Sequence, residues 1–147
     1  MANQKALKAL APAMMPVDGR AIVITDKYVL SATNPPAADT IDFRIPGGMR
    51  VTDLDFQVDD IDSGTASLFG VGYRAVDPNS SLVASTTYFA AAGQTTGQAG
   101  GRLRCAFKPI KFEEDVYIQI VIGTAGAGTN TGQEIHMIAT GIAEGIK

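Results

Sequence analysis

The sequence predicts an all-β protein, an antiparallel β-sandwich for which the jelly-roll is the candidate topology. Three observations favour this class. Apolar residues recur at every second position in several short segments, which is the period of a strand with one buried face. Turn-forming residues separate these segments at short intervals. A chain of 147 residues is long enough for one domain that folds without disulfides or metals.

The alternation is clearest in three segments, residues 41–45, 54–58 and 69–75. Turn signals that contain glycine lie between them, at residues 46–48 and 62–64. The pattern predicts three successive antiparallel strands, each with one face in water.

Five further segments have strand character, because they are rich in β-branched residues, because apolar and polar residues alternate in them, or for both reasons. The fourth in chain order has the strongest apolar face, and the second is the weakest, with Tyr88 and Phe89 as its only large side chains. The glycine-rich loop before the last strand is expected to close a hairpin. The five segments are residues 21–30, 85–90, 103–107, 116–122 and 134–142.

Residues 1–20 are expected to form an extended N-terminal arm, and residues 21–147 a single sandwich domain. Residues 3–11 could form two helical turns that Pro12 ends. The arm is poor in strand signal, so it is expected to add little to the core. It is nevertheless too apolar to be a disordered tail without a function, and we expect it to become ordered against a partner surface. The arm residues predicted to bind that partner are Leu7, Leu10, Met14, Met15 and Val17.

Charge and composition exclude several classes. Charged residues make up only 18% of the chain, against about 25% in an average soluble domain, which suits a protein packed into an assembly. The net charge of −3 and the lack of a Lys/Arg cluster argue against nucleic-acid binding. No apolar run is long enough to span a membrane. Cys105 is the only cysteine, so no internal disulfide forms, which fits folding in a reducing cytoplasm.

The aspartates between residues 53 and 62 are the first candidates for a metal site. Residues 60–64 resemble the start of a calcium loop, but Gly64 comes one place early and Val71 stands where the loop needs Glu. Asp53, Asp55 and Asp59 are predicted to share the wet face of one strand. We therefore expect a solvated face and an Asx-type turn, with no metal ion.

Catalysis is not predicted. His136 is the only histidine, and one histidine with one cysteine cannot build a zinc site. Cys105 is expected to be a small core residue. Gly70 and Gly72 lack the third glycine of a dinucleotide site and leave one sheet face bare. Another backbone can approach there, from the same chain or from another subunit. We expect no enzyme activity, cofactor or small-molecule substrate.

Residues 45–72 read IPGGMRVTDLDFQVDDIDSGTASLFGVG, and the order of short motifs in this run carries a resemblance. A strand ends in Pro-Gly, the next strand enters an aspartate-rich turn at residues 58–64, and a third carries spaced glycines at 70 and 72. Residues 86–89 read TTYF. In these features the chain resembles small virion structural proteins of tailed bacteriophages, over most of residues 39–143.

The resemblance implies a capsid decoration (cement) protein that binds the outer lattice of the major capsid protein and stabilises the head. It also implies a homotrimer, folded in the host cytoplasm and placed on the capsid exterior. Within the virion class, the alternative is a head-vertex, head–tail or tail component. From another class, the alternative is a carbohydrate-binding β-sandwich. The chain has no Trp, and only Tyr88 and Phe89 are candidate sugar-stacking residues.

Overall fold

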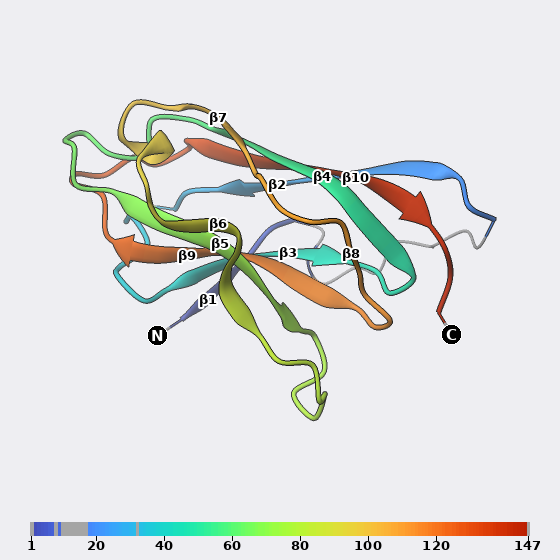
Figure 1. The fold of residues 1–147 in the computed structure, drawn as a ribbon. Helices are drawn as coiled ribbons and strands as arrows, with labels where there is room; N and C mark the ends of the chain where they lie inside the picture. The colour runs from blue at the N-terminus through green and yellow to red at the C-terminus, as the bar shows by residue number, and fades with distance from the viewer. Residues whose placement is uncertain (1, 8, 10–17, 32, 147) are drawn as a thin grey trace.

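The computed structural model describes residues 2–7, 9, 18–31 and 33–146, and it shows two β-sheets packed face to face (Figure 1). The predicted all-β sandwich is confirmed. No helix in this part of the chain is long and apolar enough to cross a membrane. The elements are β1 (Asn3–Lys5), β2 (Ala21–Val29), β3 (Thr40–Ile45), β4 (Met49–Val58), β5 (Leu68–Ala75), β6 (Ser85–Gln94), the 3-10 helix η1 (Thr96–Gln98), β7 (Gly101–Arg104), β8 (Ile110–Lys111), β9 (Val116–Thr124) and β10 (Glu134–Ala143).

The strand order is that of a jelly-roll. One sheet, here called sheet A, has the order β1-β3-β9-β5-β6, and the other, sheet B, has the order β2-β10-β4-β7, with β8 also paired to β4. From β2 onward, β2 pairs with β10, β3 with β9, β4 with β7, and β5 with β6. This is the pairing of one long hairpin wound into two four-stranded sheets. β1 is added to β3 as a parallel edge strand.

The prediction that residues 41–45, 54–58 and 69–75 form three neighbouring strands is wrong. β3 and β5 lie in sheet A with β9 between them, whereas β4 lies in sheet B. The short connection at residues 46–48 carries the chain from one sheet to the other. Gly48 has a φ of +88°, and a Cβ on it would lie 2.9 Å from the backbone of Gly145. Placing successive strands in facing sheets lets each apolar face bury the other.

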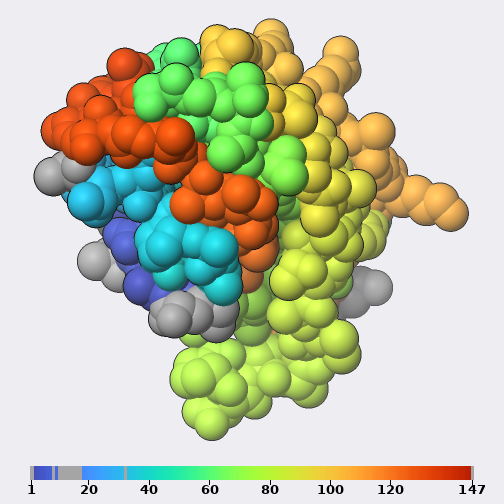
Figure 2. Space-filling model, turned by 90° about the vertical axis from the view of Figure 1, so that its left-hand side faces the viewer, coloured from blue at the N-terminus to red at the C-terminus, as the bar shows by residue number. Residues whose placement is uncertain are grey.

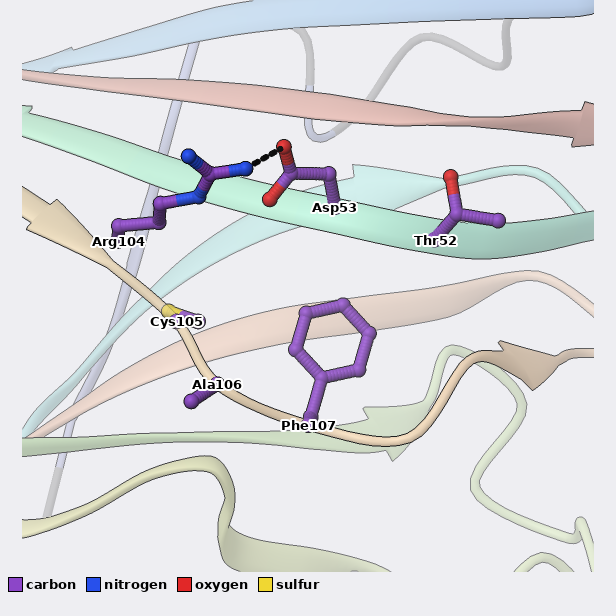
Figure 3. Close-up of a pocket in the computed structure, with 6 residues that line it drawn as sticks. All are labelled: Thr52, Asp53, Arg104, Cys105, Ala106 and Phe107. Carbon is purple, nitrogen blue, oxygen red and sulfur yellow. Dashed lines mark hydrogen bonds and ion pairs between the residues drawn. The ribbon is translucent and has the colours of Figure 1, made fainter.

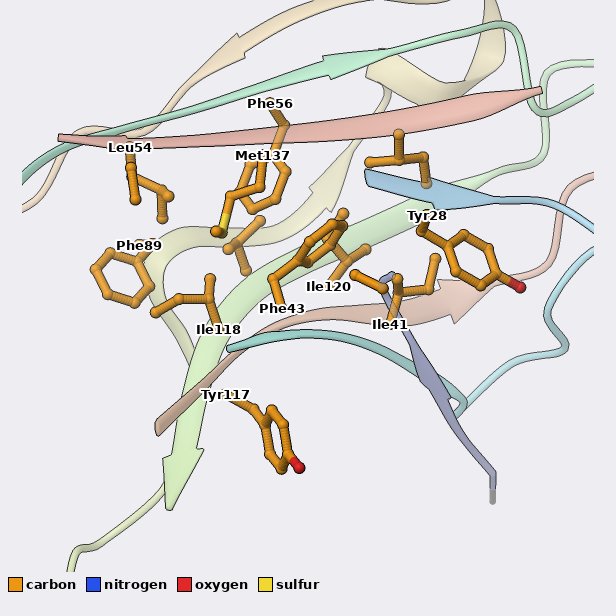
Figure 4. Close-up of a cluster of buried hydrophobic side chains, with 14 of the residues drawn as sticks. Tyr28, Ile41, Phe43, Leu54, Phe56, Phe89, Tyr117, Ile118, Ile120 and Met137 are labelled. Carbon is orange, nitrogen blue, oxygen red and sulfur yellow. The ribbon is translucent and has the colours of Figure 1, made fainter. Parts of the chain in front are cut away.

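The buried faces follow the predicted alternation. Ile41 and Phe43 of sheet A point into the sandwich and meet Leu54 and Phe56 of sheet B (Figure 4). The rings of Phe43 and Phe56 pack edge to face, with their centroids 5.6 Å apart. The core is therefore the layer between the two inner faces, as a sandwich requires.

Asp55 corrects the expected wet face of β4. It points out of the core, yet it is only 5% exposed, because β4 is an interior strand of sheet B and Arg102 of β7 forms an ion pair over it. Asp53 is more exposed and pairs with Arg104 at 3.2 Å. On the outer face of β4, Asp53 and Asp55 are thus held in ion pairs with β7 and are not free in water.

Three local predictions also fail. β1 occupies part of residues 3–11, where helical turns were expected, because Asn3, Gln4 and Lys5 pair with β3. At residues 103–107 the strand β7 ends at Arg104, with the amide of Cys105 still bonded to the carbonyl of Leu54 in β4, and the Phe107 ring beyond it packs against Phe89 at 4.7 Å between centroids. Residues 123–132 join β9 in sheet A to β10 in sheet B and close no hairpin.

Candidate assembly surfaces

The N-terminal segment closes one side of the sandwich. After β1, the amide of Ala6 donates to the carbonyl of Asp42 in sheet A, at 2.9 Å. The next amide, of Leu7, donates to the carbonyl of Lys27 in sheet B, also at 2.9 Å. Residues 2–7 therefore connect the edges of the two sheets. Ala6 and Ala9 are buried in the core, so the expectation that this segment adds little to the core is wrong for these two residues.

The predicted partner-binding residues of the arm are only partly covered by the structure. Leu7 is 68% exposed and stands at the surface beside β2, available to a partner. The other four, Leu10, Met14, Met15 and Val17, lie outside the described residues. Partner binding by this set, and the boundary between arm and domain at residue 20, stay predictions.

A buried carboxylate on the outer face of sheet A anchors the N-terminal segment. The side chain of Asp42 is fully buried and accepts hydrogen bonds from Lys5, Arg74 and Gln119. Lys5 and Arg74 also lie over the ring of Tyr117, with the Lys5 ammonium 3.7 Å from the ring centroid. Hydrogen bonds and opposite charges on several sides are what a buried carboxylate needs. Around Asp42, this face of sheet A is therefore occupied by the chain's own polar side chains.

The two spaced glycines of β5 serve contacts within the chain. A Cβ on Gly72 would lie 1.9 Å from the carbonyl oxygen of Ser85, and one on Gly70 would lie 3.3 Å from the backbone of Thr86 and Ala92. β6 therefore lies close over the outer face of β5 where side chains are missing, and its register shifts along β5. Of the two possibilities left open by the sequence, the structure realises the intramolecular one.

The β5–β6 hairpin tip, residues 76–84, projects from the body of the molecule. In Figure 2 the yellow-green part of the chain extends beyond the rest at the lower edge. Val83 in this tip is 81% exposed, more than any other large apolar side chain that the structure describes. The projection of this tip was not predicted, because its only local signal in the sequence is a turn motif at residues 77–80.

The aspartate-rich turn is organised by Asp62. Its carboxylate accepts backbone N–H donors from Gly64, Ala66, Ser67 and Ala127, at 2.6–2.9 Å. These hydrogen bonds favour the charged form, so they lower the pKa of Asp62 below its usual value. Asp60 accepts the amide of Asp62 in the expected Asx-type turn. The carboxylate ties this turn to the loop after β9.

The candidate metal and catalytic residues do not form a common site. His136 is on the outer face of sheet B, where its ring nitrogen lies 2.7 Å from the carboxylate of Glu134. Hydrogen bonds from Lys27 and then His136 lower the pKa of Glu134. No three His, Cys, Asp or Glu side chains among the described residues form a group that could hold a metal ion.

Cys105 is a core residue, as expected. It is buried, and this burial, with the carboxylates of Asp55 and Asp53, raises the pKa of its thiol to about 12. It lies beside a shallow depression of about 500 Å³, with the Asp53–Arg104 ion pair along one side and Phe107 on the other (Figure 3). A thiol with so high a pKa is not a nucleophile at neutral pH.

The two candidate sugar-stacking aromatics do not form an exposed platform. Phe89 is buried, and its ring packs against Tyr73 and Phe107. Tyr88 is half-buried, and its hydroxyl donates to the carbonyl of Lys108 at 3.0 Å. Both rings belong to an aromatic cluster that fastens β6 to the segment after β7, and no observation favours the carbohydrate-binding alternative.

No family model and no curated protein matches the sequence. Comparison of structures finds similar chains. One comes from the capsid of Ralstonia phage GP4, with a TM-score of 0.72 and 22% sequence identity over 95% of this chain and 97% of that chain. Another comes from the capsid asymmetric unit of cyanophage Pam1, with a TM-score of 0.61 and 17% identity over 90% and 94% of the two chains. The chain shares its fold with chains of two phage capsids. In both cases the likeness extends over nearly the whole of each chain.

Proposed function

We propose that this chain is a structural protein of a phage virion, a decoration (cement) protein on the outer surface of the head. It binds neighbouring subunits of the major capsid protein, acts as a homotrimer and carries out no catalysis. The observation that carries the proposal is the match over 95% of this chain to 97% of a chain from a phage capsid. The likeness is not confined to a part of either chain, so the two share the sandwich as a whole.

The arrangement of the molecule fits a mechanical role. The sandwich is held by a continuous apolar core and is closed on one side by residues 2–7. Such a body keeps its shape while its exposed loops and edges make contacts. A decoration protein works by adding contact area across subunits, and many weak copies acting together give a stable shell. Leu7, exposed beside β2, and the hairpin tip around Val83 are the described apolar groups best placed for such contacts.

The proposal is tested with heads of the same phage that lack this chain. Purified protein is added to these heads, and binding is measured by sedimentation together with the heads and by cryo-electron microscopy. We expect saturable binding at repeated outer lattice positions. We also expect the heads to resist a higher temperature before they release DNA, because binding to the assembled state stabilises it by mass action.

The alternatives give different results. A head-vertex, head–tail or tail component would be found at one vertex or in purified tails, and not across the lattice. A carbohydrate-binding module would leave the heads unbound and would bind members of a glycan array. Either result would overturn the decoration role.

A further inference from the structure

Asp39, the residue before β3, is a buried carboxylate without a cation. It is only 4% exposed, and the one hydrogen bond that its side chain accepts in the described part of the chain comes from the backbone nitrogen of Ala2, at 2.7 Å. None of the ion pairs in that part of the chain includes Asp39. Burial, and then the negative charge of Asp39, raise the pKa of Tyr28, so this neighbour stays a neutral phenol. A buried carboxylate usually has an opposite charge beside it, as well as hydrogen bonds.

Asp42 in β3 shows the usual arrangement. Its side chain is fully buried, and it forms ion pairs with Lys5 and Arg74. The same N-terminal segment faces both carboxylates, with Lys5 at Asp42 and Ala2 at Asp39. Lys5 brings a positive charge, whereas the nitrogen of Ala2 in an intact peptide bond is neutral and has a single N–H. The segment therefore supplies a counter-ion at one of the two sites and only a neutral donor at the other.

The fold fixes the position of the Ala2 nitrogen. The carbonyl of Ala2 accepts the amide of Thr40 at 3.0 Å, and the side chain of Asn3 accepts the hydroxyl of Thr40 at 2.8 Å. Asn3 and Thr40 are also the first partners in the parallel pairing of β1 with β3. The nitrogen thus stays beside Asp39 as long as β1 is paired, whichever group is attached to it.

We propose that the peptide bond between Met1 and Ala2 is hydrolysed, and that the new α-ammonium group of Ala2 is the counter-ion of Asp39. Water adds across the bond, so that the carbonyl carbon of Met1 leaves as a carboxylate, and the nitrogen of Ala2 keeps the electron pair of the broken bond and takes up protons. A free α-amine has an ordinary pKa of about 7.7–8.0 and is mostly charged at pH 7. A distance of 2.7 Å from this nitrogen to the carboxylate suits a charge-assisted hydrogen bond.

The enzyme class that performs this hydrolysis on a chain translated from Met1 is a methionine aminopeptidase. Such enzymes accept methionine when the residue that follows it is small, and Ala2 is small. They act on the nascent chain, so the bond is cut before β1 pairs with β3. The modification concerns the folded domain alone and does not depend on the proposed capsid role.

The test compares two forms of the same chain. Residues 1–147 are expressed in bacteria from Met1, and intact-mass spectrometry should show a chain that lacks one methionine and begins at Ala2. A second culture with the aminopeptidase inhibited yields the form that keeps Met1. Urea unfolding followed by circular dichroism measures the folding equilibrium constant of each form. We expect it to be about five- to tenfold larger for the form that begins at Ala2, because a charged donor makes the stronger hydrogen bond.

Two changes assign this difference to the ammonium and its carboxylate. Asp39→Asn keeps an acceptor oxygen without the charge, so it should abolish the difference between the two forms. Asp18→Asn, at an exposed aspartate, should leave the difference unchanged. Acetylation of the Ala2 nitrogen by a co-expressed N-terminal acetyltransferase removes the charge without restoring Met1. The acetylated chain should be as stable as the form that keeps Met1, and this result does not depend on whether Asp39→Asn folds.

Four results would overturn the proposal. The first is a chain that keeps Met1 when the aminopeptidase is active. The second is an equal folding equilibrium constant for the forms with and without Met1. The third is a difference that survives in Asp39→Asn, and the fourth is an acetylated chain as stable as the one with a free ammonium.

Discussion

The carbonyl oxygen of Ser85 lies 1.9 Å from the position that a Cβ on Gly72 would occupy. This relationship fixes β6 over the outer face of β5, and it requires glycine at residue 72. We predict that Gly72→Ala lowers the free energy of unfolding by at least about 1–3 kcal/mol, since the added methyl group must displace backbone. Urea unfolding followed by circular dichroism measures the change. Gly64→Ala is the control, because its nearest neighbours would lie at 3.5 Å, and a loss as large as that of Gly72→Ala would contradict the explanation.

The inner face of β9 is predicted to be central to the core. Ile120 is 1% exposed and packs between the sheets. Replacing it with Ala should cost about 2–5 kcal/mol, the usual range for a large side chain removed from a packed core. Val23→Ala, on the outer face of sheet B, should stay within about 0.5 kcal/mol. Equal losses in denaturant unfolding would mean that the two faces are assigned wrongly.

Lys5 is predicted to stabilise the folded domain, although the N-terminal arm was expected to add little to the core. Its ammonium is paired with the fully buried carboxylate of Asp42. Lys5→Met should cost about 1–3 kcal/mol, because the carboxylate loses one of its charged donors. Lys27→Met removes the partly exposed Lys27–Glu134 pair and should cost less than about 1 kcal/mol. Thermal melting of the two variants checks this order, and a reversed order would refute it.

Asp62 is predicted to make the fold sensitive to acid. Its pKa is lowered in the folded state by backbone N–H donors, led by that of Ser67. The folded state therefore gains stability from Asp62 above the unfolded pKa of about 3.9, and loses it as the pH falls through the lower folded pKa. Asp62→Asn should lower the melting temperature at pH 7, and its difference from the wild type should shrink as the pH falls below about 4.

The control for this pH dependence is Asp18→Asn, which changes an exposed aspartate near the N-terminus. Its melting temperature should follow that of the wild type at every pH. If the difference between Asp62→Asn and the wild type stayed constant down to the lowest pH at which the protein folds, the carboxylate charge would not be the cause.

The sequence by itself determined where most of the longer strands lie and which of their side chains face the core. The two-residue period at 41–45, 54–58 and 69–75 predicts the inner faces that the structure has, because pleating is a local property of the backbone. Asx turns and glycine spacing are equally local, and the turn around Asp62 and the bare face at Gly70 and Gly72 follow from them. The sandwich class and its jelly-roll candidate could be predicted from strand number and spacing alone.

Only the tertiary structure decided which strands are neighbours and which polar groups are covered. β2 pairs with β10 across more than a hundred residues of sequence. The residues of a strand do not indicate which distant strand it will pair with. The burial of Asp55 under Arg102 and of Asp42 among Lys5, Arg74 and Gln119 depends on those pairings. The projection of Val83 is also a property of the assembled fold, because exposure is set by what the rest of the chain leaves uncovered.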